Sequence, residues 1–328
     1  MVARGGMVFR NFKLSHTHLR SSILFCSLFL FSVGFAQQQE PEQVLIKKSK
    51  KQTKVFSDTA VTLQNFEVSG YIQAQYQRGE KGAELRVRRG RIKLLYEYGI
   101  ASVVFQPDIT EKGILVKDAF LSIKDPWFGM NVFKVGIFNR PFGHEIGYSS
   151  SIRESPERSI IFRTLFPEER DVGAQLTLQP AKTSVWSFLK LEAGLFYGNG
   201  IQQETDDYKD FIGHLSANKC VGRDIKFGFG LSYYHGGVYQ GGENSYVFKD
   251  HGFDLSKNTL NKGEFAKREY VGFDGQFSIR SGLGMMHLRS EYLFGVQPGV
   301  KSNSKSPNES KLPSTDTYIR NFSGGYVI

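Results

Sequence analysis

A run of cations occupies alternating positions in residues 84–96, ELRVRRGRIKLLY. Its basic members are Arg86, Arg88, Arg89, Arg91 and Lys93. An arginine fork donates two parallel hydrogen bonds to a phosphate or carboxylate, whereas a lysine ammonium binds such groups as a point charge. The run therefore predicts one of two arrangements. Either it forms an anion-attracting strip, or it forms a ladder of ion pairs with acids on neighbouring strands, for which the candidates are Glu67, Glu97, Asp108 and Asp118.

The apolar residues of the same run predict a β-strand with an irregularity in its middle. Leu85 and Val87 fall on one parity of the alternation, whereas Ile92 and Leu94 fall on the other. A β-bulge inserts one extra residue into a strand and re-aims the side chains that follow it. The switch falls at Arg88-Arg89-Gly90, so we expect a bulge there, with Arg89 at the kink and the other four cations on the polar face.

Residue patterns for other kinds of chemistry are absent from the sequence. It has no CxxC, no HExxH, no cluster of His and Cys, and no P-loop, so we expect no metal site and no cofactor. His214 and Ser216 share one face of a predicted strand, but a hydrolase on the outer wall of a barrel would need them on the apolar face. We therefore expect no enzyme, no catalytic residue and no nucleic-acid partner.

The strip belongs to a chain in which strands with one apolar and one polar face repeat. Residues 66–76 (FEVSGYIQAQY) and 225–234 (IKFGFGLSYY) are typical examples. In this way the sequence predicts twelve strands, at 66–76, 84–96, 100–108, 115–123, 130–138, 172–179, 188–198, 209–218, 225–235, 269–279, 283–294 and 318–328.

The lengths of the connections between these strands favour a transmembrane barrel over a soluble sandwich. Every second connection is short, and the three long ones, 139–171, 236–268 and 295–317, all fall at the same end of the strands. Outer-membrane barrels have short periplasmic turns and longer external loops. We therefore expect an all-β fold, a transmembrane antiparallel up-and-down β-barrel. Its interfacial aromatic residues would be Tyr76, Tyr96, Tyr98, Trp127, Phe128, Tyr197, Tyr233 and Tyr292.

The free-energy cost of placing a charged side chain in lipid predicts the face of the strand on which the basic strip lies. An Arg or Lys on the lipid face at the bilayer midplane costs ~2–4 kcal/mol. Several of them on one strand would be prohibitive, so the apolar positions are expected to face lipid and the cations to face the lumen.

The start of the chain predicts export. An apolar run, Ile23–Phe35, follows basic residues and ends in small ones, which is typical of a signal peptide over residues 1–36 cleaved after Ala36. Removing its four basic residues from 42 leaves 38 against 32 acidic ones, so the net charge of +10 falls to about +6. One cysteine, Cys220, remains, which excludes an internal disulfide. Residues 37–62 are expected to form a mobile periplasmic segment, and residues 63–328 the barrel.

Several runs of the chain resemble the phosphate-selective porin O/P family. They include RRGRIKLLY (88–96), VKDAFLSIK (116–124), FKVGIFNRPFGHE (133–145), FPEERDVGAQL (166–176), KDFIGHLSAN (209–218) and YIRNFSGGY (318–326). The resembling runs follow the family order over most of residues 66–328. The resemblance implies a sixteen-stranded barrel, usually a homotrimer, with an inward-folded third external loop and arginines along an anion path. Twelve strands against sixteen, and an end at GGYVI, predict a chain truncated by about four strands.

From these observations we expect an outer-membrane porin in the bacterial outer membrane. It would pass small hydrophilic solutes by diffusion and prefer anions such as phosphate. The strip Arg86, Arg88, Arg89, Arg91 and Lys93, with Arg140 where the third loop begins, would line the path. That loop, 139–171, has nearly balanced charges, which predicts salt bridges within it. Two alternatives stay open, namely a non-selective porin with a charge-paired lumen and a non-conducting scaffold or adhesin.

Overall fold

The structure, a computed structural model, describes residues 6–8, 65–79, 82–250, 252–256, 261–282, 284–305 and 312–328. Within them the chain is all-β, as predicted, with one short helix, α1 (Ile160–Leu165). The long strands are β2 (Phe66–Gly79), β3 (Gly82–Tyr98), β4 (Ala101–Thr110), β5 (Gly113–Lys124), β6 (Val132–Asn139), β7 (Arg170–Leu178), β8 (Leu189–Phe196), β9 (Asp210–Val221), β10 (Ile225–Tyr239), β13 (Phe265–Ser281), β14 (Gly284–Gly299) and β15 (Thr317–Val327). They confirm the twelve predicted strands.

Three further strands lie outside the predicted set. A hairpin of β11 (Ser245–Lys249) and β12 (Gly252–Ser256) occupies the connection between β10 and β13. The third, β1 (Gly6–Val8), pairs with β2 and falls within the predicted signal peptide. The rest of that peptide and the predicted segment 37–62 lie outside the described residues.

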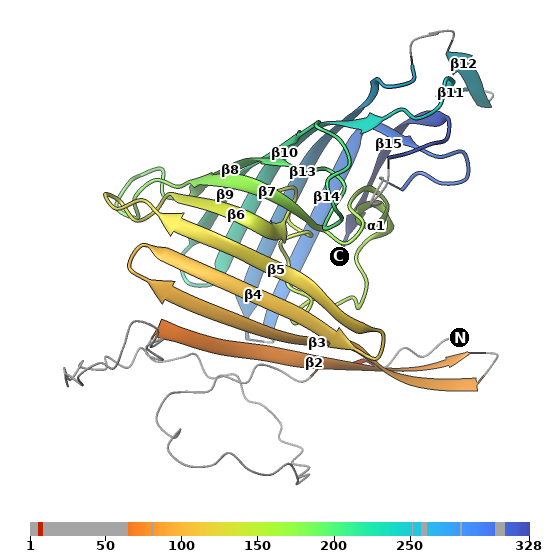
Figure 1. Cartoon of the computed structure of the whole chain (residues 1–328). Coiled ribbons are helices and arrows are strands. Elements are labelled where there is room, and N and C mark those ends of the chain that lie inside the picture. The colour runs from red at the N-terminus through yellow and green to blue at the C-terminus, as the bar shows by residue number, and fades with distance from the viewer. Residues whose placement is uncertain are drawn as a thin grey trace, which may run out of the picture.

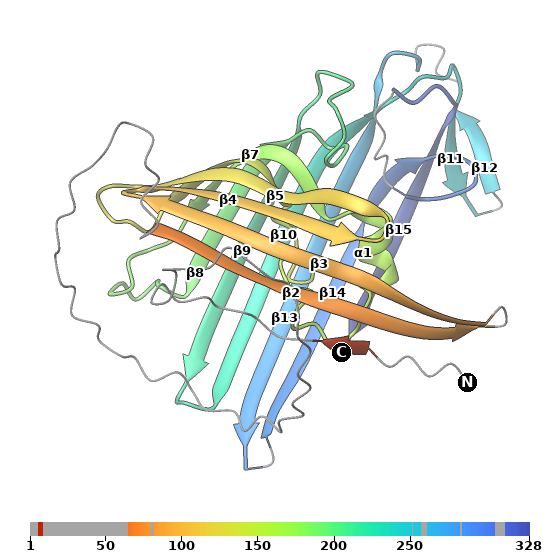
Figure 2. The same ribbon diagram turned by 60° about the horizontal axis from the view of Figure 1, so that its bottom comes forward.

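All described strands belong to one sheet, and from β1 to β10 each strand pairs with the next in antiparallel order. The order continues through β13, β14 and β15, and β11 then pairs parallel with the first residues of β15. No pairing joins β2 to β15 within the described ranges. The sheet curves strongly, so that β2–β5 and β13–β15 lie on opposite sides of the connection that carries α1 (Figures 1 and 2).

The two ends of the sheet differ in the length of their connections. At one end, hereafter the short-connection end, the described strands are joined by residues 99–100, 125–131, 179–188, 222–224 and 282–283. The other end carries residues 80–81, 111–112, 140–169, 197–209, 240–264 and 300–316. The predicted asymmetry is confirmed, because every connection longer than 179–188 between the described strands β2 and β15 lies at this second end.

The two faces of the sheet differ in polarity, because successive side chains of a strand point to opposite faces. The convex face exposes apolar side chains, among them Ile72, Leu85, Ile92, Phe105, Leu121, Phe133, Leu176, Leu191, Leu215, Phe229, Leu231, Phe273, Leu288 and Phe294. The concave face buries polar ones, among them Gln73, Gln75, Asp108, Ser122, Gln175, Asp210, His214, Ser232, Asp274 and Glu291. A soluble protein keeps its apolar residues inside, so this polarity is inverted.

The connection 140–169, hereafter the inward loop, packs against the concave face. Its Phe142 and Phe166 rings lie 4.9 Å apart, and the Phe166 ring meets Tyr234 of β10 and Tyr270 of β13 edge-on at 5.9 and 5.7 Å. Gly272 makes room for this packing, because a Cβ there would lie 2.8 Å from the Phe142 ring. The apolar core therefore joins the loop to the wall, and not one sheet to another. Among the described residues, no helix has the length and apolar character needed to cross a membrane.

Candidate functional site

The predicted bulge in β3 is confirmed, and it aims two consecutive arginines at the same face. Gln73 of β2 pairs with Arg89 and Ala74 pairs with Val87, so Arg88 has no partner in the register. Arg88 Nη2 donates to the carbonyl oxygen of Pro156 at 2.7 Å, and both Nη atoms of Arg89 lie 3.4 Å from that oxygen. Pro156 belongs to the inward loop, so Arg88 and Arg89 both point into the concave side.

Neutral groups of β2 hold three of these guanidinium groups. Gln75 Oε1 accepts from Arg86 Nη2 and Arg88 Nη1, both at 3.0 Å. Gln73 Oε1 accepts from Arg89 Nη1 at 2.5 Å. An amide oxygen fixes the direction of a guanidinium group without cancelling its charge, so these hydrogen bonds orient the three side chains without neutralising them.

Ion pairs neutralise part of the strip. Arg91 Nε lies 3.2 Å from Asp108 Oδ2, and Arg88 forms a salt bridge with Glu157 of the inward loop. Arg86, Arg89 and Lys93 form no salt bridge with any described carboxylate. The strip therefore combines both predicted arrangements, with two paired cations and three unpaired ones.

The other candidate acids pair elsewhere. Asp118 accepts two hydrogen bonds from Arg170, at 3.0 and 3.1 Å, instead of pairing with the strip. Glu97 lies 3.9 Å from Lys124 at the short-connection end. Glu67 makes no salt bridge within the described residues, so of the four candidates only Asp108 pairs with the strip.

A further arginine, Arg153 of the inward loop, joins Arg88 and Arg89 at Pro156. Arg153 Nη2 donates to the same carbonyl oxygen at 3.3 Å. One neutral oxygen thus faces three guanidinium groups, which together carry many more donors than it can accept. Two buried nitrogens of this cluster, Arg88 Nε and Arg153 Nη1, have no hydrogen-bond partner among the described residues. We call Arg88, Arg89 and Arg153 the guanidinium cluster.

The inward loop is anchored to the wall opposite the strip. The Glu291 carboxylate of β14 accepts the backbone N–H of His144 at 3.0 Å and that of Glu145 at 2.6 Å. Ser232 Oγ of β10 accepts the N–H of Gly143 at 2.8 Å, and Arg289 forms a salt bridge with Glu154. The loop therefore spans the concave side and narrows the space next to the guanidinium cluster.

The salt bridges predicted within the loop form only in part. Within the predicted range 139–171, Arg158 Nε lies 2.5 Å from Glu169 Oε1, Arg170 Nη1 lies 3.2 Å from Glu169 Oε2, and Arg140 Nε lies 2.9 Å from Asp171 Oδ2. Glu157 and Glu154 instead pair with Arg88 and Arg289 of the wall. The charged residues of the loop therefore form salt bridges with the sheet as well as with one another.

Arg140 lies where the loop begins, as expected, but it carries no free charge. Its side chain is almost completely buried, and its Nε lies 2.9 Å from Asp171 Oδ2. The same carboxylate oxygen accepts the N–H of Gly198 at 3.0 Å. Arg140 therefore serves mainly to fix the loop to β7.

Lys117 is a concave-side cation that sequence reasoning missed. In the pairing of β4 with β5, Gln106 faces Asp118 and Pro107 faces Val116, so Lys117 is left out of the register by a second bulge. Pro107 supplies the physical reason, because proline has no N–H for the ladder. A proline within the neighbouring predicted strand was the signal that could have found it.

A cavity of about 320 Å³ lies between the loop and the strands β3–β9. Lys93, Lys134, Lys190 and Arg140 line it together with Asp118 and Glu192. Lys190 pairs with Glu192 at 2.7 Å, and Lys134 lies over the rings of Phe120 and Phe138 at 5.0 and 4.9 Å. Lys134 and Lys190 alternate with apolar neighbours in their strands, so parity alone could have placed them on this face.

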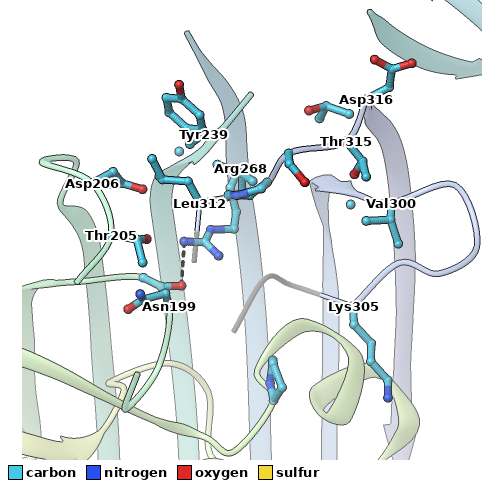
Figure 3. A pocket seen from close by; sticks show the side chains of 18 of the residues that line it. Asn199, Thr205, Asp206, Tyr239, Arg268, Val300, Lys305, Leu312, Thr315 and Asp316 are labelled. Atoms are coloured by element: carbon cyan, nitrogen blue, oxygen red, sulfur yellow. Dashed lines mark hydrogen bonds between the residues drawn. The ribbon is translucent and has the colours of Figure 1, made fainter. Parts of the chain in front are cut away.

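A second cavity, of about 500 Å³, opens at the end that carries the long connections (Figure 3). Arg268 of β13 lies in it and donates to the Gly198 carbonyl at 3.0 Å. Arg268 also forms a salt bridge with Asp210, so this cavity offers little net charge. None of Arg88, Arg89 and Arg153 lines it.

Glu169 makes the inward loop sensitive to strong acid. Burial opposes its charge, but the hydrogen bond from Arg158 and the charges of Arg158 and Arg170 lower its pKa to about 2. A lowered folded-state pKa contributes stability above the ordinary value of 4.5, and that stability is lost as the pH falls toward 2.

We therefore expect Glu169→Gln to destabilise the protein by roughly 3 kcal/mol at pH 7. The difference from the unsubstituted protein should shrink between pH 4.5 and pH 2. Urea denaturation at a series of pH values would measure it, with Glu168→Gln as the neighbouring control. A difference that stays constant across this interval would contradict the role given to Glu169.

Comparison with known proteins gives no match, either to a family model or to a curated protein. The described residues also contain no group of three or more His, Cys, Asp or Glu side chains placed to hold a metal ion.

Proposed function

We propose that the chain is an outer-membrane porin that passes small hydrophilic solutes by diffusion and prefers anions. The guanidinium cluster carries this proposal, because Arg89 and Arg153 form no salt bridge with a described carboxylate and lie with Arg88 at one neutral oxygen beside the narrowed passage. Cations along a water-filled path lower the energy of anions and raise that of cations.

The polarity of the two faces supports the membrane part of the proposal. Apolar side chains on the convex face would meet lipid, and buried polar side chains on the concave face would meet water. In the hydrocarbon region every backbone N–H and C=O must be paired, so in the membrane the sheet would form the wall of a closed barrel. From the resemblance alone we propose a homotrimer, and from the apolar run Ile23–Phe35 with its basic flank we propose export by a signal peptide.

The proposed mechanism requires no catalysis and no cofactor. A hydrated anion would enter at the end with the long connections and pass between the inward loop and β3. The arginines, held by Gln73 and Gln75, would replace part of its hydration shell. The cavity beyond contains Lys93, Lys134 and Lys190, whose ammonium groups would favour passage toward the short-connection end.

One observation favours a second candidate, a porin without ion selectivity. Arg91, Arg140 and Arg170 are each paired with an aspartate of the concave face. If the remaining cations were balanced in the same way across the path, the field along it would average to zero. Both candidates share the barrel and differ only in selectivity.

The zero-current potential in a planar bilayer distinguishes the two candidates. Under a KCl gradient we expect the reconstituted protein to give a potential whose sign shows chloride to be more permeable than potassium. Single-channel steps recorded at the same time serve as the control for insertion. A potential of zero, or one of the opposite sign, would remove the anion preference and leave a general porin.

A further inference from the structure

Both tryptophans of the chain lie in neighbouring connections at the short-connection end. Trp127 is in residues 125–131 and Trp186 in residues 179–188, and their side chains are 82% and 59% exposed. The first connection precedes β6 and the second follows β7, these two strands are paired, and the N–H of Gln179 donates to Asn131 Oδ1 at 3.1 Å. They are therefore one joined feature at one end of the sheet (Figure 1).

The first of these connections is built to hold its aromatic residues outward. The Asp125 carboxylate accepts backbone N–H groups along the turn: Oδ1 accepts from Trp127, Phe128 and Gly129, and Oδ2 from Met130 and Asn131. Five bonds to one side chain fix the backbone. Trp127 and Phe128 are therefore held in exposed positions, and no other part of the described chain covers them.

Between the two connections lies an apolar groove of about 490 Å³. It is lined chiefly by Phe128, Leu178, Pro180, Leu189, Leu191 and Leu215. Leu178, Leu191 and Leu215 belong to the exposed convex face, so the groove continues the apolar band of the sheet. Lys182 is exposed and follows Ala181, which also lines the groove, so a positive charge lies close to its rim.

We propose that this groove binds the acyl chain of a phospholipid, with the lipid phosphate near Lys182. The proposal rests on the proposed function, which places the convex face in lipid. Tryptophans with an apolar ring and a polar N–H settle at the level of lipid headgroups. Both tryptophans belong to connections that contribute residues to the groove, and the groove continues into the apolar band. This arrangement fits a lipid that lies upright, with its chain against the leucines.

The tryptophans allow a direct test of depth, because the chain has only these two. The full chain is reconstituted into phosphatidylethanolamine–phosphatidylglycerol vesicles whose acyl chains carry bromine either near the carbonyl or near the methyl end. We expect strong quenching of fluorescence by the shallow bromines and weak quenching by the deep ones. The same result is expected from Trp127→Phe and from Trp186→Phe, each of which reports on one tryptophan.

Bound lipid is counted by native mass spectrometry of the protein extracted into detergent. We expect one phosphatidylglycerol per chain to be retained. Its retention should fall roughly tenfold in Leu191→Gln, which puts an amide in the groove. The matched control is Leu231→Gln, which makes the same change on the convex face of β10 and should retain the lipid.

The outcomes separate this inference from the proposed function. No quenching by either bromine position would mean that these connections do not reach the lipid, and the groove site would fail. If single-channel steps were absent as well, the proposed function would fail with it. Quenching with no retained lipid, or with equal loss in Leu191→Gln and Leu231→Gln, would overturn the groove site alone. A second copy of the chain retained in place of lipid would overturn it as well.

Discussion

Arg88→Glu combined with Arg89→Glu should convert the protein from an anion-preferring pore into a cation-preferring one. Two unit charges about 7 Å apart interact by roughly 0.6–2.4 kcal/mol between dielectric constants of 80 and 20. Two reversals at the narrowed passage should therefore change the ratio of anion to cation permeability by roughly tenfold or more. The sign of the zero-current potential under a KCl gradient is the measurement.

The control for this double substitution makes the same change of charge away from the passage. Arg223 and Lys112 are exposed in connections at opposite ends of the sheet, and Arg223→Glu with Lys112→Glu should leave the selectivity unchanged. Arg88→Gln with Arg89→Gln should give an intermediate potential. If the glutamate variant still favours chloride while its barrel remains folded by heat-shift electrophoresis, the guanidinium cluster does not set the selectivity.

Glu291→Ala should release the inward loop from the wall. The Glu291 carboxyl group accepts two backbone N–H groups of the loop and the Tyr326 hydroxyl at 2.5 Å, and each hydrogen bond contributes ~0.5–1.5 kcal/mol net. We expect larger single-channel steps with frequent fluctuations, and faster cleavage of the loop by added protease.

Tyr326→Phe is the matched control for the loop anchor. It removes the hydroxyl from Glu291 but leaves the bonds to His144 and Glu145 in place, so conductance should change little. If Glu291→Ala behaved like Tyr326→Phe, the contacts of Phe142 and Phe166 with Tyr234 and Tyr270 would be sufficient to hold the loop.

Much of the sheet could be predicted because each strand has to show one apolar and one polar face. The alternation predicted each end of β3 to within two residues of its observed position, and the change of parity at Arg88 predicted its bulge. The bulge at Lys117 went unnoticed because Ile114, Leu115 and Val116 form a continuous apolar run, in which no change of parity is visible.

The partners of the charged residues could not be predicted, because they depend on how a long connection folds back. Arg88 was expected to pair across neighbouring strands, yet its carboxylate comes from Glu157, which is 69 positions later in the chain. Arg153 joined the guanidinium cluster for the same reason. The hairpin β11–β12 was missed because residues 245–256 lie in a polar connection where a five-residue strand has too few positions to show alternation.

Because of the bulge at Arg88, the number of cations along the passage depends on the number of residues in β3 as well as on their types. Deleting one residue from Val87-Arg88-Arg89 would restore an unbroken ladder with β2 and leave one fewer cation on the concave side. A strand of identical composition but shifted by one position would turn its arginines toward lipid. Relatives of this chain should therefore tolerate substitutions along β3 more readily than insertions or deletions, so that β3 varies in residue type but keeps its length.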